Sequence, residues 1–457
     1  MLNEDSTIDP ETAAKTAYAA CTYFYPLVLL DQAWRQHPAP INQFRHDAGL
    51  SRCITHPDPH VLYSTAWLDL EAGPVVLGLP NLGARQVLVS MIDARGRVFA
   101  SAGARATGVL ACEVVIVGPG WVGEIGPGLS ALRAPTDRVW LVARTPIDPE
   151  APQVAPALQR GLYLTPIRGA GTTTDPVCIA DDWPARAVVT MKASDLFGRL
   201  AGLLDARPAS RADAEVMESL RRVGVIPGRP FDPRRLPPEV AEAVRDGVAR
   251  ALADIAATTL GDGGAPWASL ALERGRAGAP LDHARRVHTC IGLNLKDDAI
   301  DFLAERDGDG QPLNGAHRYR LHFDQFRTPQ VEGDWSLTAY DLNGAPPARP
   351  RGRLALSGHD RLRFNADGSI DLRIQHNPPP DPLAANWAPC PPGDFRLVLR
   401  AYWPRHSLLS GFWRPPAVRR LREFALPADG WPDPPSIEIG VVAPNPQPST
   451  QESNRPA

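Results

Sequence analysis

Short runs of alternating apolar residues, separated by Gly, Pro and Asn, occur in two long stretches of this chain. Strand-length runs punctuated in this way, without helical segments between them, are typical of antiparallel sandwiches and barrels. The chain has 49 prolines and 38 glycines, enough to punctuate many turns. The predicted strands are 62–70, 74–79, 86–92, 97–100, 113–117 and 138–144 in the first stretch, and 319–323, 335–341, 368–376 and 395–403 in the second.

Helical periodicity occurs before and between these two stretches. Residues 8–36 have apolar residues at helical spacing, with Asp9 placed to cap and Pro10 at the first turn. Amphipathic patterns at 193–205, 210–223 and 237–259 predict a run of helices. We therefore expect an α+β protein, mainly β, in which two antiparallel β-sandwich domains of jelly-roll-like form are joined by a helical connector. The expected boundaries are 1–170, 171–275, 276–425 and a Pro-rich, partly disordered tail at 426–457.

Charge and cysteine content limit the classes of partner. The 457 residues carry a formal net charge of -3, so no global field favours nucleic acid or an anionic membrane. The six cysteines are scattered without a C-x-x-C pair, which is neither a zinc framework nor a dense disulfide scaffold. We find neither a signal peptide nor an apolar stretch long enough to cross a bilayer. These features predict a cytoplasmic protein with no nucleic-acid or membrane partner.

One glycine motif raises the question of a dinucleotide cofactor. Gly118-Pro-Gly-Trp-Val-Gly123 matches G-x-G-x-x-G and follows an apolar strand. The fingerprint needs a helix that opens at the third glycine, and the Gly-Pro-Gly at 126–128 opposes such a helix. We therefore interpret the motif as a hairpin turn and expect no dinucleotide.

The strand at 62–70 is the strongest strand signal in the N-terminal half, and its alternation gives two different faces. Leu62, Ala66 and Leu68 face one way, towards a core, and the opposite face carries aromatic and polar groups. Together with a second strand, that polar face could stack on and ion-pair with a small ligand. The predicted ligand-binding residues are Tyr63, Trp67, Asp69, Trp140 and Arg144. The alternative is that Asp69 and Arg144 only pair with each other.

Histidines before this strand suggest a second kind of site. His46, His56 and His60, with Asp58, offer imidazole and carboxylate ligands suited to zinc or another divalent metal. Intervening prolines exclude a helical i,i+4 pair, so the spacing is not diagnostic. No G-x-S-x-G motif marks a serine nucleophile.

Several motifs resemble a known tandem family. Tyr25-Pro-Leu-Val-Leu-Leu30, Leu62-Tyr-Ser-Thr-Ala-Trp-Leu-Asp-Leu70, Gly118-Pro-Gly-Trp121 and Ala134-Pro-Thr-Asp-Arg-Val-Trp140 resemble domain of unknown function 1254. Trp335-Ser-Leu-Thr-Ala-Tyr-Asp341, Phe364-Asn-Ala-Asp-Gly-Ser-Ile370, Asn386-Trp387 and Leu399-Arg-Ala-Tyr-Trp-Pro404 resemble domain of unknown function 1214. The resemblance implies two β-sandwich domains bridged by helices and a homo-oligomer, without an established reaction.

The sequence differs from that family pattern just before the strand at 62–70. Relatives usually have Asn or Asp followed by Asp-Thr there, and this chain has Asp58-Pro59-His60-Val61. Our leading hypothesis is an oligomeric binding or structural protein with a pocket for a small polar ligand. The alternative is a metal-assisted hydrolase or lyase acting on a small polar or carboxylated substrate.

Overall fold

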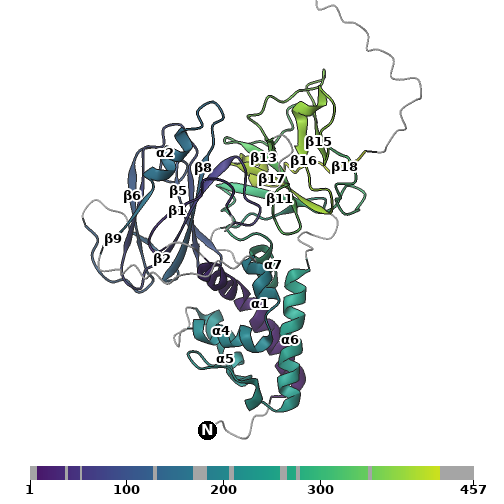
Figure 1. Cartoon of the computed structure of the whole chain (residues 1–457). Coiled ribbons are helices and arrows are strands. Elements are labelled where there is room, and N and C mark those ends of the chain that lie inside the picture. Colours follow the sequence, from purple (N-terminus) through teal and green to yellow (C-terminus); the bar gives the residue numbers. More distant parts are fainter. Residues whose placement is uncertain are drawn as a thin grey trace, which may run out of the picture. The chain divides into compact units, whose positions relative to one another are not determined.

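The computed structural model of the chain describes residues 8–36, 40–51, 54–126, 131–167, 183–204, 210–257, 265–273, 278–347 and 352–421 (Figure 1). The predicted tail at 426–457 lies outside these ranges. Within them the protein has eight α-helices and four mostly antiparallel sheets, none of which closes into a barrel. The predicted α+β class is confirmed at this level.

Two sheets form the N-terminal β unit. The larger has the order β1-β2-β8-β4-β5 and the smaller β7-β6-β3-β9. Leu68 and Leu141 of the larger sheet share one hydrophobic core with Leu77 and Ile116 of the smaller. The strands are β1 (Arg45–His46), β2 (Val61–Asp69), β3 (Val75–Leu79), β4 (Leu88–Asp93), β5 (Val98–Gly103), β6 (Cys112–Val117), β7 (Ala131–Arg133), β8 (Arg138–Pro146) and β9 (Tyr163–Pro166).

The connection after β6 corrects one sequence interpretation. β7 pairs with β6 in parallel, whereas a hairpin joins antiparallel neighbours. The Gly118–Gly123 motif therefore begins a crossover, and its interpretation as a hairpin turn is wrong. Arg133, at the end of β7, donates hydrogen bonds from Nη1 to the carbonyl oxygens of Gly118 and Pro119, at 3.2 and 2.9 Å.

The C-terminal β unit is built in the same way from two sheets, with orders β10-β11-β17-β13-β14 and β16-β15-β12-β18. Phe302 and Leu337 of the first sheet share a core with Leu321 and Leu372 of the second. The strands are β10 (Ala268–Ser269), β11 (Ala299–Ala304), β12 (Tyr319–Phe323), β13 (Trp335–Asp341), β14 (Ala355–Ser357), β15 (Ile370–Gln375), β16 (Trp387–Pro389), β17 (Phe395–Tyr402) and β18 (Arg419–Arg420).

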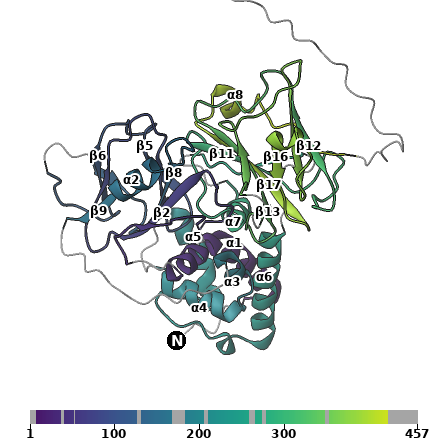
Figure 2. The ribbon, with the colours of Figure 1, turned by 45° about the horizontal axis from the view of Figure 1, so that its top comes forward.

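Most helices gather into one group, the helical layer, below the two β units in Figure 1, and its core continues into the β2–β8 face of the larger N-terminal sheet (Figures 1 and 2). That face contributes Tyr63, Trp67 and Trp140 to the helical core. The layer contains α1 (Pro10–Arg35), α3 (Pro184–Val189), α4 (Ala193–Leu203), α5 (Arg211–Arg222), α6 (Pro238–Ala256) and α7 (Pro280–Thr289). Two short helices, α2 (Val154–Gly161) and α8 (His406–Leu409), and 3-10 turns at Pro233–Arg235 and Leu383–Asn386 complete the described helical elements. None of the helices in the described ranges is long and apolar enough to cross a bilayer.

The helices α1 and α6 approach each other closely, although more than 200 residues separate them along the chain. Tyr18 of α1 donates its hydroxyl to the Asp254 carboxylate of α6 at 2.8 Å. Gly247 of α6 faces the backbone of α1, and a Cβ added there would overlap the carbonyl oxygen of Ala14. The missing side chain therefore sets how near the two helices can lie.

We expect Gly247→Ala to lower the free energy of unfolding by about 1–3 kcal/mol, because the added methyl group overpacks the contact with α1. Gly198→Ala in α4 is the matched control, since nothing lies within 4 Å of a Cβ at that position. The free energy of unfolding of the control should rise by up to about 1 kcal/mol, from helix propensity alone. Urea unfolding curves measure both changes, and a stabilised Gly247→Ala variant would contradict this account of the contact.

Candidate functional site

The loop before β2 connects the two β units through Asp58, which is completely buried. Its backbone N–H donates to the hydroxyl of Tyr63 at 2.8 Å. Its carboxylate Oδ2 accepts from Ser336 Oγ at 2.8 Å and from the Tyr402 hydroxyl at 3.0 Å. Ser336 is in β13 and Tyr402 in β17, so one side chain of the N-terminal unit is bound by two strands of the C-terminal unit.

Arg400 of β17 supplies the positive charge at this junction. Its guanidinium makes a two-point ion pair with Asp301 of β11, at 2.8 and 2.9 Å. The same side chain donates to the carbonyl oxygen of His56 at 3.1 Å, and its Nη1 lies 3.5 Å from Asp58 Oδ2. Only 4% of Arg400 is exposed, so water screens these interactions weakly. We call Asp58, Asp301 and Arg400 the buried ionic network.

The buried ionic network affects the ionisation of Asp58 and of the neighbouring His60. Burial alone would raise the pKa of Asp58, but hydrogen bonds from His60 and the charge of Arg400 lower it far below its usual range. Burial also disfavours the charged form of His60, yet the carboxylates of Asp58, Asp334 and Asp360 outweigh it and raise the pKa of His60. The His60 Nδ1 lies 3.4 Å from Asp58 Oδ1. Asp58 is therefore an anion at neutral pH that favours an imidazolium beside it.

Four of the five predicted ligand-binding residues are buried. Tyr63, Trp67, Trp140 and Arg144 are 1%, 2%, 1% and 3% exposed. The rings of Trp67 and Trp140 stack 5.5 Å apart, and the Arg144 guanidinium lies 5.6 Å from the Tyr63 ring centre and donates to the Gly292 carbonyl at 2.5 Å. That these residues bind a ligand stays a prediction.

The register of β2 on β8 decides the alternative pairing. Asp69 lies opposite Arg138, whereas Arg144 lies opposite Tyr63, six positions further along β8. The suggested pairing of Asp69 with Arg144 is therefore wrong. The two side chains occupy opposite ends of the same pair of strands.

The three predicted metal-ligating histidines lie in different surroundings. His46 makes a hydrogen bond through Nδ1 with Ser64 Oγ at 2.9 Å. His56 is buried with its ring 4.9 Å from that of Tyr340, and burial followed by the charges of two arginines lowers its pKa to about 3. Across the described ranges, no three His, Cys, Asp or Glu side chains are grouped in a way that could hold a metal ion. The metal site stays a prediction.

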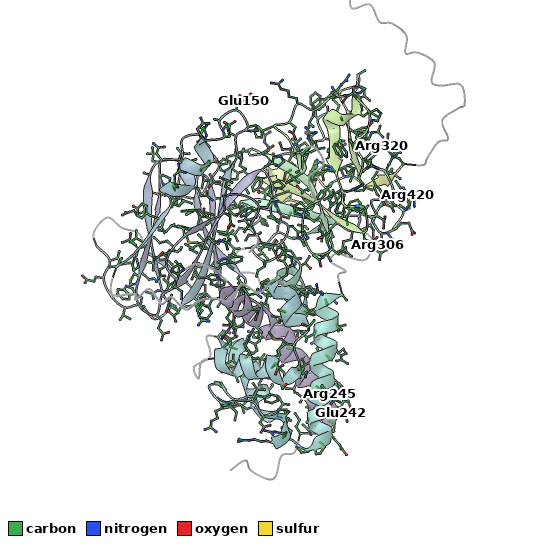
Figure 3. The ribbon with its side chains drawn as sticks, in the orientation of Figure 1. Glu150, Glu242, Arg245, Arg306, Arg320 and Arg420 are labelled. Atoms are coloured by element: carbon green, nitrogen blue, oxygen red, sulfur yellow. The ribbon has the colours of Figure 1, made fainter. Side chains whose placement is uncertain are left out.

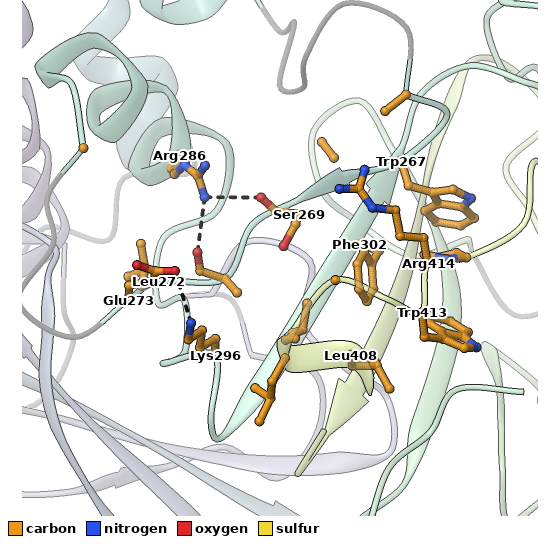
Figure 4. A pocket seen from close by; sticks show the side chains of 18 of the residues that line it. Trp267, Ser269, Leu272, Glu273, Arg286, Lys296, Phe302, Leu408, Trp413 and Arg414 are labelled. Carbon is orange, nitrogen blue, oxygen red and sulfur yellow. Dashed lines mark hydrogen bonds and ion pairs between the residues drawn. The ribbon is translucent and has the colours of Figure 1, made fainter. Parts of the chain in front are cut away.

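A separate pocket of about 810 Å³ opens on the C-terminal unit, between α7, the β10–β11 edge and the segment after α8 (Figure 4). One wall is aromatic and aliphatic, formed by Trp267, Phe302, Leu408 and Trp413. Both indole N–H groups in this wall are bound elsewhere, Trp267 to the Pro416 carbonyl and Trp413 to the Arg327 carbonyl. The wall therefore offers apolar surface to the pocket.

The opposite wall is charged. Arg286 of α7 donates from Nη1 to the carbonyl oxygens of Ser269 and Ala271, both at 3.2 Å. Lys296 pairs with Glu273 at 3.1 Å. These cations are held in place by the chain itself.

Arg414 differs from the other cations of the pocket. Within the described part of the chain it makes no hydrogen bond or ion pair, and it is exposed. Figure 4 shows its side chain reaching from the segment that carries Trp413 towards Ser269 on the other wall. This guanidinium can therefore bind an anion without first losing a partner.

Sequence reasoning missed this pocket because its walls come from distant segments. Trp267, Arg286, Lys296 and Arg414 have no common spacing. The only local signal is Phe412-Trp413-Arg414, an aromatic and basic run next to a proline.

The fold defines a protein of two β-rich units, each with paired sheets around a core, with a helical layer and a buried ionic network between them. The chain belongs to a tandem family of uncharacterised proteins. Residues 41–166 match "Protein of unknown function (DUF1254)" and residues 298–406 match "Protein of unknown function (DUF1214)". The order of the two matches confirms the resemblance found in the sequence.

The fold is similar to that of a solved structure. The crystal structure of the VPA0106 protein from Vibrio parahaemolyticus is 19% identical with a TM-score of 0.66, covering 90% of this chain and 100% of that one. A putative uncharacterized protein from Burkholderia cenocepacia is 14% identical with a TM-score of 0.43, covering 92% of this chain and 91% of that one. No curated protein matches the chain.

The ionic network should contribute strongly to stability. We expect Arg400→Met to lower the free energy of unfolding by about 3–5 kcal/mol, because it leaves two buried carboxylates without their cation. Arg245→Met is the matched control, since Arg245 pairs with Glu242 on the exposed surface of α6 at 2.9 Å (Figure 3). The control should lose less than about 1 kcal/mol. Equal losses in denaturant titrations would show that the network is not a main source of stability.

The raised pKa of His60 predicts a pH dependence with a definite sign. A raised folded-state pKa adds stability that is fully present below the ordinary histidine pKa and is lost as pH rises through the folded-state value. The stability lost in His60→Gln should therefore be larger at about pH 5.5 than at about pH 8. In His46→Gln the trend should be opposite, because burial lowers the pKa of His46. Chemical unfolding across this pH range measures the stability lost in each variant. The same trend with pH in both variants would contradict the opposite pKa shifts of the two histidines.

Proposed function

We propose that the protein binds a small molecule in the pocket between α7, β10 and β11. The observation that carries the proposal is the combination of size and lining. A volume of about 810 Å³ lies within the range of about 300–1,000 Å³ that small-molecule sites occupy. An apolar wall facing a few placed charges is the usual lining of such sites.

The charges on the pocket lining favour a negatively charged ligand. Four cationic side chains face two carboxylates, an excess of two positive charges. His283 also lines the pocket, and burial lowers its pKa, so it adds no charge at neutral pH. The cations are Arg285, Arg286, Lys296 and Arg414, and the carboxylates are Glu273 and Asp282.

The remaining sequence expectations accompany this proposal. We infer that the sheets of each β unit pack as a sandwich of jelly-roll-like form, because each pair shares one core. Homo-oligomerisation, a cytoplasmic location and a ligand at the Tyr63–Trp67 face stay predictions. A metal-assisted hydrolase or lyase using His46, His56 and His60 also stays a prediction.

Filling the pocket tests the proposed function. Ser269 is exposed on β10 and lines the pocket, so Ser269→Trp should occupy the space without disturbing a core. Ala157→Trp, on the exposed side of α2, is the matched control. In a fragment screen, we expect compounds that raise the Tm of the native protein and the control variant but not of Ser269→Trp. Saturation-transfer NMR then confirms contact. The proposal would be contradicted by a screen that finds no binders, or by compounds that raise the Tm of Ser269→Trp as much as that of the native protein.

A further inference from the structure

We propose that the ligand of this pocket is a monocarboxylate carried on an aryl or alkyl body, with the carboxylate held by Arg414. The inference rests on the proposed function and adds the chemical class of the ligand. It depends on which cation of the pocket has no partner and on which surface lies beside it.

Arg414 is the cation placed to receive an anion. Arg286 already binds two carbonyl oxygens, and Lys296 already pairs with Glu273. Arg285 donates from Nε to the Asp254 carbonyl at 2.7 Å. In the described ranges, Arg414 alone among these four has no such contact. A guanidinium presents two parallel N–H groups that match the two oxygens of a carboxylate.

The number of uncommitted cations limits the charge of the ligand. One unpaired guanidinium balances one negative charge, whereas a second anionic group would have to share Lys296 with Glu273, or use the N–H groups of Arg285 and Arg286 that do not already bind carbonyl oxygens. Each of those cations is already held by other contacts, so it gives a second anionic group a less adaptable partner than Arg414 gives the first. A monoanion therefore fits this lining better than a dianion.

The surface next to Arg414 indicates the rest of the ligand. Trp413 precedes it in the chain, its ring 6.0 Å from that of Phe302, and Trp267 and Leu408 extend the same wall. This wall offers no indole N–H, because both are hydrogen-bonded to backbone carbonyls. Contact with it favours apolar atoms in proportion to the area removed from water. A carboxylate alone would leave this wall unused.

Two acids and matched neutral and truncated compounds test the ligand class. The probes are 4-phenylbutyrate and octanoate, their primary amides, and acetate, measured by isothermal titration calorimetry at low ionic strength. We expect each acid to bind about tenfold or more tightly than its amide, as for a charge-assisted contact, and acetate not to bind because it lacks the apolar body.

Variants of Arg414 assign the preference to one side chain. Arg414→Gln should abolish the preference for acid over amide, whereas Arg414→Lys should keep part of it. Arg229→Gln is the matched control, because Arg229 is exposed and is not part of the pocket lining. All variants should keep the native unfolding midpoint, since Arg414 has no contact to lose in the described structure.

The two proposals fail in different ways. Equal binding of acid and amide, no binding of either acid while screened fragments still bind in the pocket, or an Arg414→Gln variant that keeps the preference, would overturn the ligand class and leave a small-molecule pocket. No binding by any probe, together with a screen in which Ser269→Trp has no effect, would overturn the proposed function itself.

Discussion

Arg400 is the side chain on which the arrangement of the β units most depends. It is buried between two carboxylates from different units, and a charge in that position is stable only when its partners are fixed around it. The contacts of Arg400 with Asp301 and His56 lock β17 against β11 and against the loop before β2. The network therefore specifies which surfaces of the two units meet.

The helical layer shares a core with a sheet face that the buried ionic network does not cover. The β2–β8 face carries Tyr63, Trp67 and Trp140, a large apolar area that must be removed from water. Residues of α1 and α7 share a hydrophobic core with that face, and the loop after α7 contacts it through Gly292, which lies against Trp140 and accepts from Arg144. The segment expected to serve as a connector, 171–275, thus completes a core, and α7, which follows it in the chain, forms one side of the pocket.

Local patterns predicted the elements, but not which of their faces stay open. The strands at 319–323 and 335–341 match β12 and β13 because alternation and flanking turns fix them locally. The β2 face was predicted to be accessible because Tyr63 and Trp67 alternate with apolar residues, yet it is buried in a core that it shares with segments distant in sequence. The pocket was missed for a related reason. Its residues meet only through tertiary contacts, and Arg286, Lys296 and Arg414 lie outside both matched family ranges.

The departure at Asp58-Pro59-His60 takes on a structural meaning. The Asp58 carboxylate already accepts from the His60 backbone, Ser336 and Tyr402 and lies beside Arg400, so it has little capacity left for a ligand. A change at this position would alter how the β units are joined before it altered any chemistry. The guanidinium of Arg414 lies elsewhere, in the pocket beside the aromatic wall. A function that distinguishes this chain is therefore better sought at the pocket than at the head of β2.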